Sequence, residues 1–260
     1  MSTTAPLRRA FLGPALAAAQ AAPSVAGQAR FDGCLAMSLW PRADVERLLP
    51  SDLVLAPRAD TAAAAPHPVL ALFGEHLDSG LVIAGLLLPM GIRYWEFCLA
   101  IPYVAARGGR HLHTYVARMY SSYFPAVWTS NAHYGFAKAQ ADMRWEGPLF
   151  VVTAPGGALL WHAAVESDAA WQRGDASGLA PLAEALALPM AGRRADGTWL
   201  ESYFQLDFGA ALLRPTRARL SVDAPLVEGL APRLDYALPG AALQVQGMLW
   251  RLTHPGPCHW

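Results

Sequence analysis

The sequence contains almost no lysine. Of the twenty basic residues in the 260-residue chain, nineteen are arginine, and Lys138 is the only lysine. Arginine can often replace lysine where only a surface cation is needed, but it keeps its charge at any accessible pH. A lysine amine can lose its proton and attack a carbonyl carbon. A lysine retained in such an arginine-rich chain is therefore a candidate for amine chemistry.

Other scarcities exclude several classes of protein. Charged residues make up only 15% of the chain, and twenty acids balance twenty bases, so nothing indicates a nucleic-acid partner. The strongest apolar run, residues 81–92, is too short to cross a bilayer and contains Pro89 and Gly91, which predicts buried core and no membrane span. The three cysteines are widely spaced and form no CxxC pair, which argues against disulfides and structural zinc and predicts a cytoplasmic protein.

The N-terminal segment, residues 1–28, differs in composition from the rest of the chain. LRRAFLGPALAAAQAAP combines paired arginines, a short apolar stretch and small residues, as a twin-arginine export signal does. Pro14 interrupts the apolar stretch, which favours an alanine-rich helix and leaves export as the alternative. We therefore predict an N-terminal extension over 1–28 and a single domain over 29–260.

Strand-like patterns outnumber helical ones. We expect a mostly β, α+β fold, because the pattern shows no regular alternation of strands and helices. Helices are expected within 41–53, starting near Pro41 and closed by Pro50, from Pro125 to a stop at Gly135, and at 178–188. Strands are expected at 69–104 with interruptions at GEHLDSG, PMGIR and Pro102, and at 109–120, 148–154, 158–166, 199–208 and 241–252. After Gly135, alternation predicts one strand face carrying Lys138, Gln140, Asp142, Arg144 and Glu146.

Several short segments resemble the acetoacetate decarboxylase family. PAV at 125–127 opens a helix, and YGFAK at 134–138 follows it at the spacing of the family's Schiff-base lysine motif. YWE at 94–96 and AIP at 100–102 are similar to a strand of that family that carries a glutamate. The likeness covers residues 30–150 well and is looser toward the C-terminus.

The resemblance implies a fold of curved sheets, or a cone-shaped barrel, around an apolar cavity. It implies a lyase in which Lys138 forms a Schiff base with a keto acid or another small carbonyl compound, with Glu96 positioning substrate or relaying a proton. Phe136 and Arg30 are the expected substrate-binding residues. It implies no cofactor and no metal, and a homo-oligomer.

Three features of the family have no counterpart. One is an acidic residue on the strand before Glu96, where LALFG, around Ala71 and Leu72, is wholly apolar. The residue after the Schiff-base lysine is Ala139 instead of a second lysine, so we expect activation of the Lys138 amine to depend on burial. In the family, an arginine on the first strand is associated with the substrate carboxylate. When the motifs are aligned, the corresponding position in this chain is Gly33, and Arg30 is close by but not aligned with it. These departures favour aldol, dehydration or hydration chemistry as much as decarboxylation.

Alternative interpretations remain for each of these residues. Glu96 could form a structural ion pair with Arg93 or Arg118. His111 and His113 could share one strand face and hold a metal, although no glutamate follows them as it does in metal-binding barrels. The whole chain could also be a non-catalytic cavity protein that binds an apolar small molecule.

Overall fold

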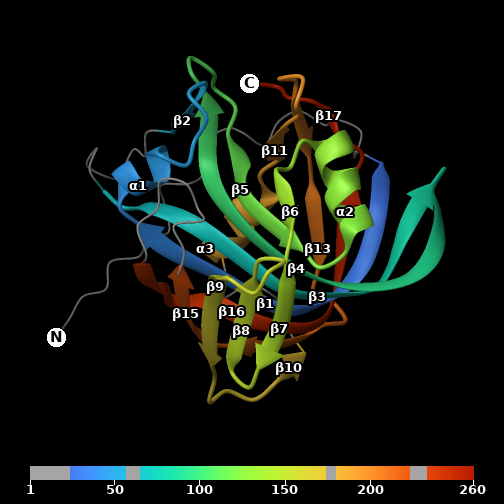
Figure 1. Ribbon diagram of the computed structural model, residues 1–260, viewed down its shortest axis with the longest axis vertical. Helices are drawn as coiled ribbons and strands as arrows, with labels where there is room; N and C mark the ends of the chain where they lie inside the picture. The colour runs from blue at the N-terminus through green and yellow to red at the C-terminus, as the bar shows by residue number, and fades with distance from the viewer. Residues whose placement is uncertain (1–23, 57–64, 174–179, 223–232) are drawn as a thin grey trace.

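The structure is a computed structural model that describes residues 24–56, 65–173, 180–222 and 233–260 (Figure 1). Residues 1–23 lie outside this part, and so do the predicted N-terminal helix and export signal. Strand β1 begins at Val25, before the domain boundary expected at residue 29.

Strands dominate the fold, and they share one large mixed sheet, which confirms the mostly β prediction. They are β1 (Val25–Trp40), β2 (Leu53–Leu55), β3 (His67–Ile83), β4 (Leu86–Ala106), β5 (His113–Ser121), β6 (Lys138–Gln140), β7 (Asp142–Glu146), β8 (Leu149–Thr153), β9 (Leu159–Glu166), β10 (Gln172–Arg173), β11 (Met190–Arg193), β12 (Trp199–Ser202), β13 (Phe204–Asp207), β14 (Leu212–Pro215), β15 (Arg217–Val222), β16 (Arg233–Thr253) and β17 (Gly256–Pro257).

The helices of the described part are short. They are α1 (Arg42–Glu46), α2 (Phe124–Thr129), the π-helical turn η1 (Ser130–Tyr134) and α3 (Ala180–Ala187). α1 ends at Glu46, a few residues before Pro50, where the sequence predicted its end. No helix in the described residues is both long and apolar enough to span a membrane.

The centre of the sheet is built from long antiparallel strands. β1 pairs with β16 on one side and β3 on the other, and β4 and β5 follow β3 in order. β6 and β11 then pair with β5 in parallel. The sheet is strongly curved but not closed (Figure 1). The expectation of a barrel is therefore wrong, whereas that of curved sheets holds.

The central strands are buried on both faces. Successive residues of β1, Cys34 and Leu35, belong to two different hydrophobic clusters, and Phe97 and Cys98 of β4 divide in the same way. Because side chains of a strand alternate between its two faces, each cluster covers one face of the sheet. This explains why these strands appear in the sequence as continuous apolar runs.

A pair of glycines lets β1 and β3 lie unusually close. Gly33 is opposite Gly74, and a Cβ on either residue would come within 2.3 Å of a backbone oxygen of the other strand. Glycine inside a strand often marks such a close backbone approach. β3 therefore continues through GEHLDSG, and the interruption predicted there is wrong.

The β3–β4 hairpin exposes many large apolar side chains. It extends away from the sheet on the right of Figure 1. The exposed residues near its tip are Leu81, Ile83, Leu86, Leu87, Leu88 and Met90. PMGIR was predicted to interrupt a strand in this region, but it lies within β4. Pro102 also lies within β4, so neither interruption is present.

Candidate active site

The turn after α2 and η1 places Lys138 at the start of β6. Gly135 ends η1 in the left-handed conformation with φ 68°, as the sequence predicted for the residue past this helix. A Cβ at Gly135 would lie 2.7 Å from the carbonyl carbon of Arg193 in β11. Both the conformation and the close packing therefore require glycine at this position.

Asn131 fixes the backbone of Lys138. Its side-chain oxygen accepts a hydrogen bond from the Lys138 backbone N–H at 2.8 Å, and its amide nitrogen donates to the Lys138 carbonyl at 2.9 Å. This two-point contact joins η1 to β6. It determines where the lysine side chain begins, and sequence reasoning did not identify it.

The Lys138 amine is paired with the Glu96 carboxylate. Nζ of Lys138 lies 2.6 Å from Oε2 of Glu96, and the two side chains are 5% and 9% exposed. The strands β6, β5 and β4 lie side by side, since Met119 of β5 is opposite both Lys138 and Cys98. The two predicted catalytic residues are therefore in direct contact.

The arginine pairing considered for Glu96 is wrong. Arg93 instead donates two hydrogen bonds to Glu75, at 3.1 and 3.0 Å. Arg118 donates to the carbonyl of Ala117 at 2.7 Å. The partners of Glu96 are Lys138 and a histidine.

That histidine is His76 of β3, which sequence reasoning left without a role. Its Nε2 lies 3.5 Å from Oε1 of Glu96, and the residue is 2% exposed. Its ring stacks on Tyr94 at 4.7 Å between centroids and meets Trp250 edge-on at 5.0 Å. Glu96 is thus held from two sides, by an ammonium and an imidazole.

The electrostatics of the pair favour a charged carboxylate. Burial alone would raise the pKa of Glu96, but the charge of Lys138 and the hydrogen bond and charge of His76 outweigh it and lower this pKa to about 2. Burial and the charge of Glu96 raise the pKa of Tyr94 well above its ordinary value, so its hydroxyl stays neutral. The expectation that burial alone governs the amine is incomplete, because the amine is also in direct contact with the Glu96 carboxylate.

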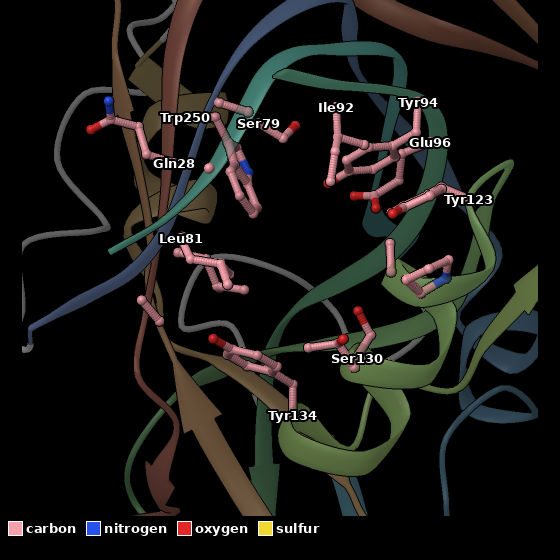
Figure 2. Close-up of a pocket in the computed structure, with 18 of the residues that line it drawn as sticks. Gln28, Ser79, Leu81, Ile92, Tyr94, Glu96, Tyr123, Ser130, Tyr134 and Trp250 are labelled. Atoms are coloured by element: carbon pink, nitrogen blue, oxygen red, sulfur yellow. The ribbon is translucent and has the colours of Figure 1, made fainter. Parts of the chain in front are cut away.

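A cavity of about 270 Å³ adjoins the pair. Lys138, Glu96 and Phe136 line it, and Phe136 is 2% exposed. Figure 2 shows the Glu96 carboxylate beside Tyr94 and Tyr123, with Trp250 and Leu81 across the cavity. A further wall comes from α2 and η1, and it includes Ser130 and Tyr134 (Figure 2).

Arg30 does not belong to this cavity. It is exposed on β1 and forms an ion pair with Asp78 of β3. Its neighbours Ala29 and Gln28 line the cavity, but its own side chain is absent from the lining. The geometry therefore gives no support to a substrate-binding role for Arg30.

The predicted single strand face after Gly135 is also wrong. Lys138 is buried, whereas Gln140, Asp142, Arg144 and Glu146 are all exposed. The predicted strand is interrupted between β6 and β7. These two strands belong to different parts of the sheet, because β6 pairs with β5 and β7 pairs with β8. The break leaves only Lys138 of this set pointing inward.

The two histidines considered for a metal do not share a strand face. His111 is exposed and precedes β5, whereas His113 is buried in it. Nε2 of His113 instead lies 2.9 Å from Oε2 of Glu201. Cys258 is close by, and one ligand atom from each of these three residues lies within 4.8 Å of the others.

Comparison with known proteins identifies similar folds among solved structures but no similar sequence. No protein-family model and no curated protein matches the sequence. Acetoacetate decarboxylase from Legionella pneumophila aligns with a TM-score of 0.60 and 13% identity, over 100% of this chain and 98% of that one. An acetoacetate decarboxylase-like enzyme from Sphingomonas wittichii RW1 aligns at 0.60 and 15%, over 96% and 97%.

A third similar structure is the enduracididine biosynthesis enzyme MppR complexed with pyruvate. It aligns with a TM-score of 0.59 and 11% identity, over 92% of each chain. Identities this low show the fold alone. The chain has the acetoacetate decarboxylase-like fold, which confirms the resemblance at that level.

Proposed function

We propose that this chain is an enzyme in which Lys138 forms a Schiff base with a small carbonyl compound. The observation that carries the proposal is a single buried amine, paired with one carboxylate, in the wall of an apolar cavity. Perturbed ionisable groups in a cavity are a common sign of a catalytic site. The fold adds support, because the similar structures include decarboxylases and MppR.

The chemistry balances within the pair. The Lys138 ammonium passes one proton to Glu96, and the neutral amine attacks the carbonyl carbon. One N–H proton then moves from the nitrogen to the former carbonyl oxygen, which gives a neutral carbinolamine. Glu96 returns the proton to the carbinolamine oxygen, which leaves as water and produces an iminium. The nitrogen is positive before and after, so Glu96 serves as counter-ion at both ends of the step.

The iminium then acts as an electron sink for the adjacent carbon. Such a sink serves decarboxylation, aldol chemistry or loss of a β-hydroxyl group as water. Phe136 and the other aromatic walls hold the substrate and exclude water. Ala139 is exposed and contributes no charge, so activation of the amine depends on its release from Glu96.

Borohydride trapping tests the proposal. A ketone or aldehyde is incubated with the full chain, borohydride reduces any iminium, and intact mass reports the adduct. Since the chain has one lysine, an adduct lies on Lys138 or the N-terminal amine, and peptide mapping separates the two. No adduct at Lys138 with any ketone or aldehyde would exclude the mechanism.

The alternative function is binding without catalysis. The cavity is large enough to bind a small apolar molecule, and the Lys138–Glu96 pair can be structural. Saturable ligand binding without any trapped adduct would favour this second function.

Assembly and compartment are further proposals. We propose a homo-oligomer, in which a second copy covers the exposed Ile83, Leu86 and Leu87 at the end of the β3–β4 hairpin. Sedimentation of the wild type and of Leu86→Lys tests this proposal. A monomer mass for the wild type, or the same oligomer mass for both proteins, would contradict it. We also propose a cytoplasmic location, which the N-terminal mass of the native protein tests.

A further inference from the structure

We infer that the carbonyl substrate of this site is uncharged, a ketone or aldehyde with an aliphatic or aromatic body and no carboxylate. This inference rests on the proposed Schiff-base function and narrows it. It excludes loss of CO₂ as the reaction, because decarboxylation needs a carboxylate on the substrate.

The charges of the cavity wall already cancel. Among the described residues that line the cavity, Lys138 and Glu96 are the only charged side chains. They contact each other at 2.6 Å, so the lining carries one positive and one negative charge. His76 lies 3.5 Å from Glu96 but is not part of this lining. Condensation with a neutral carbonyl keeps this balance, because an iminium replaces the ammonium and neutral water leaves.

A substrate carboxylate would upset that balance. It would add a second anion to a space where Glu96 already neutralises the nitrogen. A buried charge without its own partner costs several kcal/mol in water-excluded surroundings, and a like charge nearby adds to the cost. The cavity would therefore bind the acid more weakly than a neutral molecule of the same shape.

The nearby arginines cannot supply the missing cation from where they lie. Arg93 is paired with Glu75, and Arg30 is paired with Asp78. Arg251 donates to the Gln28 side chain at 3.1 Å and is not part of the lining. Figure 2 shows the Gln28 amide turned away from Leu81 and Trp250, toward the outside of the cavity.

The rest of the lining suits an apolar body. Large apolar and aromatic side chains from several strands make most of the wall, including Met119, Phe136, Phe204, Trp250 and Leu252. The polar groups among them are hydroxyls, such as those of Ser130 and Tyr134, which are neutral donors. Burial raises the pKa of Tyr134 to about 12, so its hydroxyl is a donor and not a phenolate at neutral pH.

Three matched probes test the inference by borohydride trapping. They are 2-heptanone, 6-oxoheptanoate and methyl 6-oxoheptanoate, which are all methyl ketones. The acid and its ester share one carbon skeleton up to the carboxyl group and differ in charge. We expect Lys138 adducts with the ketone and the ester, and trapping of the acid slower than that of the ester by about tenfold or more.

Each outcome separates this inference from the proposed function. Equal or faster trapping of the acid would overturn the inference and leave the Schiff-base function in place. No Lys138 adduct from any probe, or from smaller ketones and aldehydes, would overturn both.

A new cation in the wall provides a second test. Met90 lines the cavity at its exposed side, and it is 54% exposed, so a longer polar side chain can be accommodated there. Met90→Arg is expected to raise the ratio of acid to ester trapping by about fivefold, as a partly exposed ion pair would. Met90→Gln is the matched neutral control and should leave the ratio unchanged. An unchanged ratio in Met90→Arg would contradict the charge argument.

Discussion

Two buried pairs of a base and a carboxylate in this chain differ in what surrounds them. Lys138 and Glu96 lie 2.6 Å apart with side chains 5% and 9% exposed. His113 and Glu201 lie 2.9 Å apart with side chains 1% and 9% exposed. By distance and burial, the two pairs are almost the same.

Their surroundings separate them. The Lys138–Glu96 pair adjoins a cavity of about 270 Å³, where a reactant can reach the amine. The other pair is closed by the C-terminal segment: His113 packs on Trp260 at 4.5 Å, and Glu201 also accepts the backbone N–H of His259 at 3.1 Å. Burial and pairing alone therefore do not mark a catalytic site. Free space beside the Lys138 amine is what distinguishes the candidate site from the closed pair.

The largest expected effect is the loss of the nucleophile. Lys138→Arg keeps a cation against Glu96 but removes the primary amine, so we expect no borohydride adduct at this position and no turnover. Lys138→Met is the contrasting variant, because it also leaves Glu96 buried with His76 as its only remaining partner and should cost about 3–5 kcal/mol of unfolding free energy. Denaturant unfolding and intact mass measure the two effects. An adduct at full yield in Lys138→Arg would show that the chemistry lies elsewhere.

The closed pair should show the opposite behaviour. His113→Ala leaves Glu201 buried with the His259 N–H alone, and we expect a loss of about 3 kcal/mol in unfolding free energy. The rate of adduct formation at Lys138 should not change in the folded variant. Zinc could be added to the wild type and to Cys258→Ser, and Tm measured for both. If zinc raised the Tm of the wild type but not that of Cys258→Ser, His113, Glu201 and Cys258 would form a metal site, and the pair could not serve as the non-functional half of the comparison.

The local geometry around the lysine could largely be predicted from the sequence. Pro125 opens the helix and Gly135 ends it, because these residue types suit those two positions. The motif likeness led to Lys138 and Glu96, which the structure brings into contact. Each of these features depends on residues that are close in sequence, or on a short motif.

Features that depend on distant parts of the chain could not be predicted. His76 lies in GEHLDSG, whose glycines and aspartate are typical of a turn, but in the structure this segment pairs with both β1 and β4, and Gly74 lies close against Gly33. Asn131 is exposed and gives no burial signal, although its side chain fixes the Lys138 backbone. An open sheet and a barrel share the same strand patterns, since closure depends on stagger between remote strands.

A smaller effect is expected from changing the carboxylates. Glu96→Gln keeps the size of the side chain but removes the proton acceptor and the counter-ion, and we expect the trapping rate to fall about 100-fold. Glu201→Gln is the matched control at the closed pair and should leave that rate unchanged. Equal rates in the two variants would mean that Glu96 is only structural.

The smallest expected effect is a loss of the stability that the Glu96 charge contributes, and it occurs only at acidic pH. The pKa of Glu96 is lowered from its ordinary value of 4.5 to about 2, so its charge contributes stability that is fully present above pH 4.5. That contribution is lost as the pH falls from 4.5 to about 2. The difference in unfolding free energy between the wild type and Glu96→Gln should therefore shrink as the pH falls below 4.5.

The same measurement on Glu201→Gln sharpens the comparison. The hydrogen bonds from His113 and from the His259 backbone, with the charge of His113, outweigh burial and lower the pKa of Glu201 too, so its contribution is also lost in acid. Both pairs should thus weaken at low pH, while only the Glu96 variant changes the trapping rate at neutral pH. If the Glu96 difference instead stayed unchanged as the pH fell from 4.5 to about 2, the carboxylate would not be the charged partner of Lys138, and the contrast between an open and a closed pair would fail.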